Sequence, residues 1–384
     1  MVAHLPWAQG VAGSSPAALT NYGDYKILDV IHVPAQKPNG LTCKIAFLGE
    51  APGTEELEKG QPFVGPAGKV FNSMLRTAEL DRAEFWVGNV FDHKIPENNL
   101  ENWCVSKQEA EEKGWPLTYA IPFLGILRPE YHGNLDRLAV EIAAFRPHVI
   151  VPMGSTALWA LTGETDIGVH RGCVLLSSKL VPGVKLLPTF HPAYVMRQWK
   201  FFSVVVGDFI KAAVEGETRE LVLPSKEFII EPTLGEVMQF FPRCFKSDLL
   251  SVDIETGWGQ ITCIGFAPNA NEAICIPFVD LRKPGKSYWP PDIETIVWAT
   301  VRRLLESNVP KLGQNFAAYD AFWLLNKYGI RVMNLLHDTR LLHHALYPEL
   351  PKSLAFMAGS YTRQGVWKNM SGGYGKHREK KRDD

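Results

Sequence analysis

Several features that would assign a chain to a well-marked class are missing from this sequence. No apolar run approaches the roughly 20 residues of a membrane-spanning helix, and the first residues do not form a cleavable signal. The six cysteines include no Cys-x-x-Cys pair, which argues against a disulfide framework or a zinc site. No GxxxxGKS or GxxxxGKT string marks a nucleotide-hydrolysing P-loop enzyme. We therefore expect a protein of a reducing, cytoplasmic interior with no membrane partner.

Net charge is also nearly absent, because 40 basic and 41 acidic residues sum to −1. Any contact with nucleic acid must then come from local basic patches rather than from a general field. The 384 residues, 46% hydrophobic and 21% charged, are enough for two or three globular domains. We expect a disordered leader over residues 1–22 and a basic tail over 367–384, which is either a solvated end or a phosphate-binding segment.

Apolar runs and helical patterns alternate through the first half of the chain. The runs lie at 44–48, 85–91, 148–153 and 184–190, and helical spacing lies at 70–80, 134–145 and 155–161. This alternation predicts a doubly wound parallel sheet. The runs end at or next to four polar or turn residues: Glu50, Asn89, Gly154 and His191. Because parallel strands gather their carboxyl ends at one edge, we expect these residues to line one crevice.

Two glycine-rich turns follow the first predicted strand. The first reads Gly-Glu-Ala-Pro-Gly at 49–53 and the second reads Pro-Phe-Val-Gly at 62–65. Glycines let backbone N–H groups approach an anion closely, and Phe63 offers a stiff aromatic face beside the carboxylate of Glu50. A flat polar ligand next to a phosphate would suit such a site. The alternative is an ordinary strand–helix turn with an exposed Glu50 and a core Phe63.

These two turns, at this separation, resemble the first motif of uracil-DNA glycosylases, particularly the family 4-like branch and the glycosylase-like domains that precede phage-type DNA polymerases. The run His-Pro-Ala-Tyr-Val-Met-Arg at 191–197 resembles the second motif of that family, and the similarity extends from about residue 44 to 211. It implies a three-layer α/β/α glycosylase fold, to which we assign residues 23–222. The implied reaction is removal of uracil from DNA by N-glycosidic hydrolysis.

The resemblance also implies roles for individual residues. Asn89, which alone would be a strand-end cap, would pair with the O4 and N3–H edge of uracil and leave polar groups unpaired against cytosine. His191, otherwise a turn histidine, would donate to O2 of the departing uracil anion. Glu50 would position water or stabilise the sugar cation, and Val195 and Met196 are alternative wedges into the base stack. The implied sets are Glu50, Asn89 and His191 for catalysis, Gly49, Ala51, Phe63 and Asn89 for uracil, and Pro52, Gly53, Pro192 and Arg197 for DNA.

One departure from family 4 concerns its iron–sulfur cluster, which four cysteines hold in that family. The corresponding part of this chain has only Cys43, Cys104 and Cys173, and they are scattered. Three scattered thiols do not make a cluster site. We therefore expect no cluster and no cofactor in the first module.

A second module follows a predicted linker at 223–245. Alternation over 249–256 places Asp253 and Glu255 on one face of a strand, where their repulsion favours a cation and their hard oxygens favour Mg²⁺ or Mn²⁺. Strands at 260–267 and 272–277 and a helix at 292–307 come next, and Asp320 lies early in a further helix.

Three strings, Asp-Ile-Glu-Thr, Asn-x-x-x-Tyr-Asp and His-Asp-Thr, occur in this order and resemble the 3′–5′ proofreading exonuclease domain of family A DNA polymerases. The resemblance implies a ribonuclease-H-like fold over 246–366 and two-metal hydrolysis with Asp253, Glu255 and Asp320 as ligands. The fourth carboxylate of that family follows a tyrosine by four residues. Here Tyr374 is followed at that spacing by Arg378, so this ligand is absent or displaced.

The sequence as a whole therefore predicts a two-module DNA enzyme resembling the front part of a phage-type polymerase, acting in the interior of a bacterial host cell. Its expected partner is single-stranded or primer–template DNA. The polymerase module is either on a separate chain, as a second partner, or missing because the gene is interrupted. An alternative of a different class is a non-catalytic, DNA-binding accessory part of a polymerase.

Overall fold

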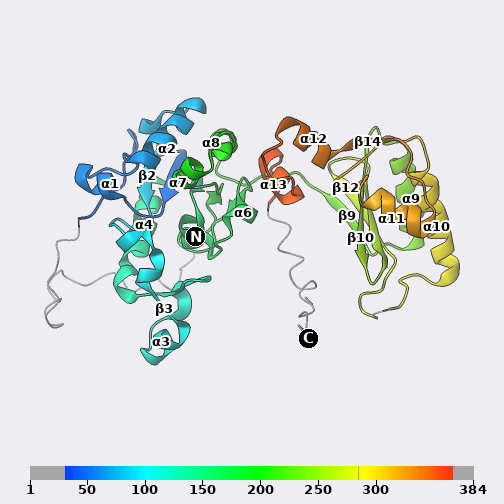
Figure 1. The fold of residues 1–384 in the computed structure, drawn as a ribbon, viewed down its shortest axis with the longest axis horizontal. Coiled ribbons are helices and arrows are strands. Elements are labelled where there is room, and N and C mark those ends of the chain that lie inside the picture. The colour runs from blue at the N-terminus through cyan, green and yellow to red at the C-terminus, as the bar shows by residue number, and fades with distance from the viewer. Residues whose placement is uncertain (1–30, 284, 366–384) are drawn as a thin grey trace, which may run out of the picture.

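The computed structural model describes residues 31–283 and 285–365, which form two domains joined by an extended segment (Figure 1). The predicted leader at 1–22 and the predicted tail at 367–384, with Tyr374 and Arg378, lie outside these ranges. Among the described residues, no helix combines the length and apolar character needed to cross a membrane. Both domains are of the α/β class, as predicted.

The first domain contains a central five-stranded sheet, a small three-stranded sheet and the helices around them. Its strands are β1 (Ile45–Gly49), β2 (Trp86–Asn89), β3 (Cys104–Val105), β4 (Ala120–Ile121), β5 (Gly125–Leu127), β6 (Val149–Pro152), β7 (Leu175–Leu176) and β8 (Lys185–Leu186). Its helices are α1 (Thr54–Lys59), α2 (Pro66–Thr77), α3 (Lys107–Glu112), α4 (Gly133–Phe145), α5 (Ser155–Thr162), α6 (Ile167–His170), α7 (Pro192–Arg197) and α8 (Phe202–Gly216).

The central sheet has the strand order β2-β1-β6-β8-β7, with β7 antiparallel to β8 and the other pairs parallel. Every residue of β1, β2 and β6 is buried, as expected for strands covered on both faces. After β1 the chain adds β2 on one side and β6 on the other, so the order reverses at β1. Ligand crevices form outside the carboxyl ends of strands at such a reversal, and Glu50 directly follows β1.

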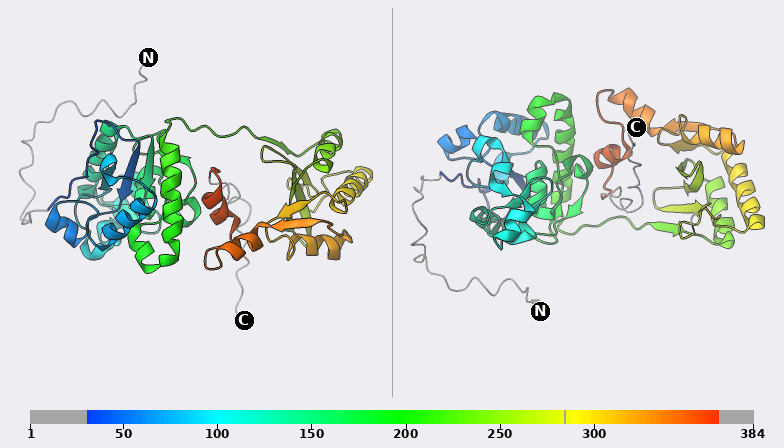
Figure 2. Two further views of the ribbon diagram at one scale, coloured as in Figure 1. Left: turned by 90° about the horizontal axis from the view of Figure 1, so that it is seen from above. Right: turned by 60° about the horizontal axis from the view of Figure 1, so that its bottom comes forward.

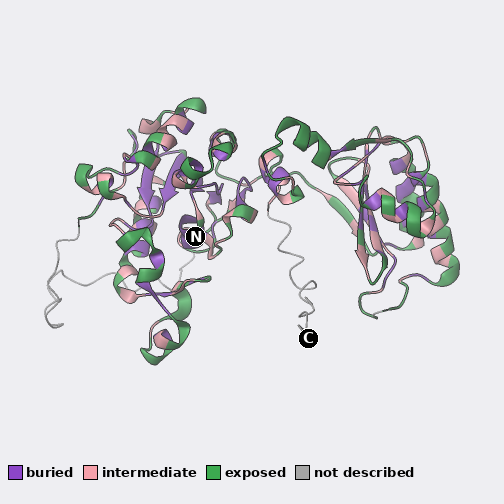
Figure 3. Cartoon of the chain, in the orientation of Figure 1, coloured by how far each residue is buried: buried purple, intermediate pink, exposed green. Residues whose placement is uncertain are grey.

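Alternate residues of β1 face opposite layers. Ile45 and Phe47 pack in the core that contains α2 and α8, where the Phe47 ring lies 4.9 Å from the ring of Phe209. Ala46 and Leu48 pack in the second core with α4 and α5. Figure 3 shows the buried strands enclosed by helices whose outer faces are exposed. The predicted three-layer α/β/α architecture is therefore confirmed.

The elements of this domain differ from prediction at three points. The run at 184–190 forms only β8, and Thr189 then meets Met153 through an isolated bridge, because Pro188 lacks the N–H that a continuous ladder needs. Helix α2 begins at Pro66 rather than at residue 70, since proline suits the first helical position. The small sheet, β3-β5-β4, was not predicted, because strands of two or three residues carry no periodic signal.

The second domain has a six-stranded sheet with the order β14-β13-β10-β11-β12-β9. Its strands are β9 (Glu227–Ile230), β10 (Leu250–Gly257), β11 (Gln260–Ala267), β12 (Glu272–Pro277), β13 (Lys311–Gly313) and β14 (Leu335–Asp338), and its helices are α9 (Leu234–Phe245), α10 (Pro291–Leu305), α11 (Asp320–Tyr328) and α12 (Thr339–Leu346). The chain then continues into α13 (Leu354–Tyr361). Strands β10, β11 and β12 form an antiparallel meander, and β13 and β14 continue parallel to β10. This order is that of the predicted ribonuclease-H-like fold.

The predicted linker at 223–245 is too long. Strand β9 pairs in parallel with β12, and α9 places Val237, Phe240, Phe241 and Cys244 in the core of the second domain. Residue Pro242 lies inside α9. The spacing of the buried residues is that of one helical face, and this burial outweighs the hydrogen bond that Pro242 cannot make. The extended connection is therefore limited to residues 217–226.

Helix α13 follows the second domain in sequence but packs on the first, against α6 and α8. Arg171, buried at the end of α6, donates to the carbonyl of Phe356 at 2.8 Å and to Ser360 Oγ at 2.7 Å. Lys211 on α8 donates to the carbonyl of Gly359 at 3.0 Å. Figure 2 shows the extended segment after α8 and the return through α12 and α13 as two separate connections between the domains.

Candidate functional site

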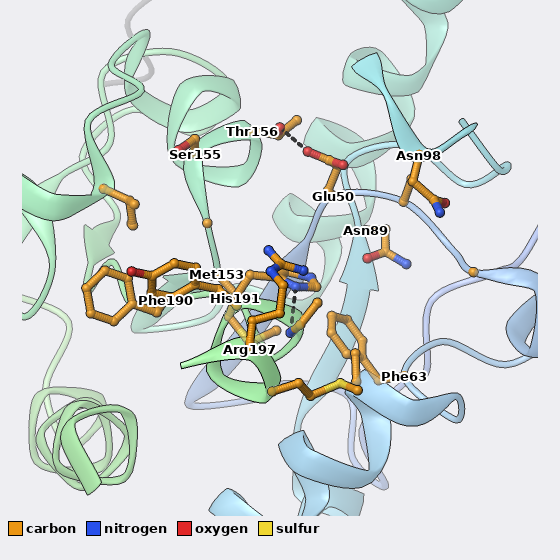
Figure 4. A pocket seen from close by; sticks show the side chains of 18 of the residues that line it. Glu50, Phe63, Asn89, Asn98, Met153, Ser155, Thr156, Phe190, His191 and Arg197 are labelled. Carbon is orange, nitrogen blue, oxygen red and sulfur yellow. Dashed lines mark hydrogen bonds between the residues drawn. The ribbon is translucent and has the colours of Figure 1, made fainter. Parts of the chain in front are cut away.

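A cavity of about 800 Å³ opens at the carboxyl ends of the central strands in the first domain. Its lining includes Glu50, Phe63, Asn89 and His191, so four residues predicted from separate stretches of the sequence lie around one pocket. In Figure 4, Glu50, Asn89 and Phe63 lie on one side of this pocket, opposite His191 and Arg197. A volume of this size is typical of a cleft that holds a small organic ligand.

Glu50 is partly buried at the point where β1 ends. The hydroxyl of Thr156, near the start of α5, donates a hydrogen bond to Glu50 Oε2. Burial raises the pKa of the Glu50 carboxyl, and the Thr156 hydrogen bond opposes this rise. Glu50 is therefore a carboxylate of raised basicity that faces the cavity, suited to hold a water molecule or to stabilise positive charge.

Asn89 ends β2 directly opposite Gly49 in the parallel register of β1 and β2. Its Oδ1 is buried and has no hydrogen-bond partner among the described residues. A Cβ atom on Gly49 would lie 2.4 Å from this Oδ1 and 2.5 Å from Cζ of Phe63. Any side chain at position 49 would therefore displace both Asn89 and Phe63. An unpartnered buried acceptor costs about 1–3 kcal/mol, and a ligand N–H would remove that cost.

Phe63 forms the aromatic wall of the pocket in an unusual backbone conformation. Its φ of +52° lies in the left-handed region, which costs a bulky residue about 1–3 kcal/mol. Arg82 compensates by donating to the carbonyls of Pro62 at 2.6 Å and Phe63 at 2.8 Å. The backbone of Phe63 also lies where a Cβ of Gly68 would be, 2.1 Å away. The ring packs 5.1 Å from that of Phe71.

The backbone N–H groups of the two glycine turns bind a carboxylate of the protein itself, that of Glu56. The carboxylate of Glu56 accepts from the backbone N–H of Gly53 and, at 3.2 Å, from that of Gly65. Glu56 thereby joins the turn after β1 to the turn before α2. The amide of Gly53 is thus occupied by Glu56. Pro52 and Pro192 are buried, and the DNA contacts predicted for Pro52, Gly53 and Pro192 stay predictions.

His191 caps α7 through its ring. Its Nδ1 accepts from the backbone N–H of Ala193 at 3.1 Å, so the neutral imidazole carries its proton on Nε2 and can donate from there. Burial and the nearby Arg197 lower the pKa of His191 to about 4. The neutral tautomer is therefore the form present at pH 7. Gly154, with a φ of +94°, leaves room behind the ring, since a Cβ there would lie 3.2 Å from His191 Cβ.

Of the other predicted residues, Ala51, Gly53 and Arg197 line the cavity, and Gly49 lies directly beneath it. Val195 is buried and Met196 is exposed at the rim, which leaves Met196 as the candidate wedge. Sequence reasoning missed Thr156, Glu56, Arg82 and the lining residue Asn98. Only Glu56 carried a signal, because it stands three residues after the helix cap Gly53, as in a capping box.

The second domain carries its predicted metal ligands within β10 and at the start of α11. Asp253 and Glu255 are exposed on β10, whereas Asp320 is buried and accepts from the N–H of Ile254 at 2.9 Å. Burial raises the pKa of Asp320 to about 6, with further contributions from Asp253 and Glu255. Partial desolvation of its carboxyl, although the residue is largely exposed, and the nearby Glu255 also raise the pKa of Asp253. The three groups share a negative field.

Such hard oxygen donors suit Mg²⁺ or Mn²⁺, which would relieve this repulsion. Among the described residues, however, Asp253, Glu255 and Asp320 are not a group whose ligand atoms all lie within 4.8 Å of one another. Binding would therefore require the exposed Asp253 and Glu255 side chains to turn toward Asp320.

Comparison with known proteins supports the division into two modules. The uracil DNA glycosylase superfamily matches residues 38–211. The type-4 uracil-DNA glycosylase of Archaeoglobus fulgidus is 30% identical over 174 residues, which cover 44% of this chain and 75% of that enzyme. The type-4 enzyme of Thermotoga maritima is 29% identical over 160 residues, which cover 41% of this chain and 68% of that enzyme.

A longer match extends across both domains. A DNA polymerase of Bacillus phage SP01 is 23% identical over 341 residues, which cover 81% of this chain but only 33% of the polymerase. Among solved structures, the exonuclease domain of EXD2 is 20% identical at a TM-score of 0.24, covering 32% of this chain and 62% of that chain. The glycosylase match includes every pocket residue described above, and this chain covers three quarters of its archaeal relative. The chain therefore belongs to the uracil-DNA glycosylase superfamily.

Proposed function

We propose that the first domain excises uracil from DNA by hydrolysing the N-glycosidic bond of a flipped deoxyuridine. The observation that carries this proposal is the meeting of three groups in one cavity beside an aromatic ring: the unpartnered Oδ1 of Asn89, the carboxylate of Glu50 and the Nε2–H of His191. Each group has the chemical character that one step of the reaction needs.

Recognition rests on Phe63 and Asn89. Stacking of a base on an aromatic side chain contributes about 1–3 kcal/mol, and the buried Phe63 ring is fixed for this purpose. Asn89 Oδ1 accepts the N3–H of uracil while its amide group donates to O4. Cytosine has an acceptor at N3 and a donor at C4, so both contacts would face like groups. A site built to pair polar groups rejects such an analogue strongly.

Bond cleavage rests on His191 and Glu50. As the bond between N1 and C1′ breaks, its electron pair moves onto uracil and is shared with O2, which accepts a hydrogen bond from His191 Nε2. One positioned donor of this kind contributes on the order of 3 kcal/mol. Glu50 stabilises the sugar cation and holds the water that adds to C1′, and the water's proton passes to Glu50 or to solvent. The exposed Arg197 at the rim is suited to bind a DNA phosphate.

The test is release of uracil from single-stranded uracil-containing DNA in the presence of a chelator. Wild type should be active, and Glu50→Ala, Asn89→Ala and His191→Ala should each be slower by on the order of 10²–10³. Glu58→Ala, which removes an exposed carboxylate on α1, should behave as wild type. Release by wild type no faster than by Glu50→Ala would refute the proposal.

We further propose that the second domain degrades DNA from its 3′ end, with Asp253, Glu255 and Asp320 holding Mg²⁺ or Mn²⁺. Their shared negative field supports this, as does the match to a phage DNA polymerase over 81% of this chain. Bound ions would activate water and stabilise the leaving 3′ oxygen.

In the presence of Mn²⁺ we expect shortening of a 3′-ended oligonucleotide that Asp253→Ala abolishes. Asp248→Asn, which alters an exposed carboxylate just before β10, should leave this activity intact. Wild type that does not shorten the oligonucleotide contradicts the proposal for this domain.

The alternative is that both domains only hold DNA for a polymerase module. This alternative predicts salt-sensitive DNA binding without product in either assay. We propose single-stranded or primer–template DNA and such a polymerase module as partners, because the phage relative is itself a DNA polymerase of which this chain matches 33%. Product in either assay excludes the alternative for the domain concerned.

A further inference from the structure

Two histidines and an aspartate meet on the first domain, outside the uracil pocket. His32 Nδ1 and His93 Nδ1 each lie 3.0 Å from Asp92 Oδ1. The ligand atoms of these three side chains all lie within 4.8 Å of one another. No other group of three or more His, Cys, Asp or Glu side chains among the described residues meets this condition. None of them lines the cavity that contains Glu50 and Asn89.

We propose that His32, Asp92 and His93 bind a divalent transition-metal ion, with Zn²⁺ as the best chemical match. Two imidazole nitrogens and one carboxylate oxygen are the ligands that Zn²⁺ commonly takes, whereas Mg²⁺ prefers oxygen alone. Three protein ligands leave a fourth position for water. His32 is 61% exposed at its side chain, so solvent reaches the site from that side.

The charges around the group favour a cation. Arg137 Nε lies 3.5 Å from Asp92 Oδ2, but Arg137 also pairs with Glu141 at 3.0 Å. With neutral imidazoles, Asp92, Arg137 and Glu141 together carry one negative charge, which a divalent ion converts to one positive charge. Glu141 therefore offsets the charge of Arg137, so Arg137 does not repel a bound cation as an unpaired arginine would.

Groups around the ligands already fix two of them. The backbone N–H of Asp92 donates to Asn134 Oδ1 at 3.1 Å, and the carbonyl of Asp92 accepts from the N–H of Val33 at 2.6 Å. The His93 ring packs 4.8 Å from that of Trp103. Contacts of this kind orient metal ligands before an ion binds. The exposed His32 would be the ligand ordered by the ion itself.

The position of the site indicates what the ion does. Asp92 lies three residues after Asn89, and the loop between them continues to Asn98, which also lines the uracil pocket. His32 lies in the segment that enters the domain and pairs through Gln36 with Val87 of β2. The ion would therefore fasten the entering segment to the base of this loop, as a structural clip rather than a catalytic centre.

The test is binding of Zn²⁺ to the untagged full chain after removal of metals with a chelator, measured by calorimetry. With excess Mg²⁺ present to occupy Asp253, Glu255 and Asp320, we expect one Zn²⁺ per chain, with affinity lowered more than about tenfold in His32→Ala and in Asp92→Asn. Zn²⁺ should also raise the midpoint of thermal unfolding of wild type but not of these variants, because a ligand of the native state stabilises it by mass action. Uracil excision at moderate temperature should survive without the ion, since the bond between Val33 and Asp92 remains.

His344→Ala, which removes an exposed histidine on α12, is the matched control and should bind Zn²⁺ as wild type does. His32 is exposed and contributes little packing, so its variant should fold, and circular dichroism checks this. Wild type that takes up no stoichiometric Zn²⁺, or His32→Ala that binds the ion as tightly as wild type, overturns the proposal.

Discussion

Glu50 and His191 face the same pocket, and burial acts on them in opposite senses. Burial raises the pKa of the Glu50 carboxyl and lowers that of the His191 imidazole to about 4, because it disfavours the charged form of each. At pH 7 the site therefore combines a carboxyl of raised proton affinity with an uncharged histidine donor. The proposed cleavage uses the carboxylate form of Glu50 and the neutral form of His191.

The first prediction concerns the acid side of the pH profile. As pH falls, Glu50 should take up a proton through its raised pKa before His191 does at about 4, so kcat/KM for uracil release should decline with Glu50. Thr156→Val removes the hydrogen bond that lowers this pKa, and should move the decline to higher pH. Rates measured from pH 4 to 8 in both proteins test this. A decline at the same pH in both would assign it to another group.

The second prediction concerns stability. A carboxyl whose pKa is raised in the folded state binds its proton more tightly there than in the unfolded chain, so ionised Glu50 destabilises the fold above its unfolded pKa. Glu50→Gln keeps the shape without the charge and should raise the unfolding midpoint at pH 7, a gain that shrinks as pH falls through the raised pKa. Thermal unfolding at several pH values measures it. A lower midpoint at pH 7 would contradict the assignment.

For individual residues, the sequence indicated the functional side chains at the strand ends but not the residues that fix their positions by hydrogen bonds. Glu50, Asn89 and His191 were found because each stands at or next to the carboxyl end of an apolar run. Arg82 was not found, because its partners are backbone carbonyls 19 and 20 residues away. No spacing rule connects a side chain to such distant carbonyls.

Between the elements, the turn from α1 to α2 is held by Arg82 on one side and Glu56 on the other. We predict that Arg82→Lys, which cannot reach both carbonyls in the same fork, lets the Phe63 backbone relax. One hydrogen bond from a charged group contributes about 1.5–3 kcal/mol, so stability should fall by about that amount, and kcat/KM for uracil release by roughly tenfold or more. Urea unfolding and steady-state kinetics measure these effects.

Arg76→Lys, on the exposed face of α2, is the matched control and should change neither quantity. If Arg82→Lys keeps both stability and kcat/KM, the strain at Phe63 is not held by this contact.

Long periodic elements were predictable at this scale, and short or interrupted ones were not. The meander β11–β12 was predicted at its observed bounds because each strand alternates over six to eight residues. Helix α9 has a clear apolar face, but it lies in the predicted linker and contains Pro242, which is unfavourable inside a helix. Burial of Phe240 and Phe241 is a tertiary effect, and it decided the outcome.

In the whole molecule, the contact of α13 with the first domain depends on two glycines. A Cβ on Gly359 would lie 2.3 Å from the carbonyl oxygen of Arg171, and a Cβ on Gly172 would lie 2.2 Å from the carbonyl oxygen of Gly359. Arg171 also pairs with Asp208 at 2.9 Å inside this contact. No pattern within either domain predicts this packing, because it joins residues nearly 190 positions apart.

We predict that Gly359→Ala destabilises the chain although alanine favours helices by up to about 1 kcal/mol. The added methyl group would force the two backbones apart and weaken the contacts of Arg171 and Lys211. Gly235→Ala on α9, where a Cβ would meet nothing closer than 3.8 Å, should be neutral or stabilising. Thermal unfolding compares the two variants. A higher midpoint for Gly359→Ala than for wild type would show that α13 does not dock this way.

The polypeptide leaves the first domain after α8 and returns to it with α13. The second domain is therefore attached to the first at two points, here called anchors, rather than at one. A protease nick in the exposed stretch between Glu220 and Ser225 would cut one anchor and leave the other. The fragments should then co-elute on gel filtration and separate only when the Gly359→Ala change is also present. A DNA strand released by one domain would, by the same geometry, stay within a short and limited reach of the other.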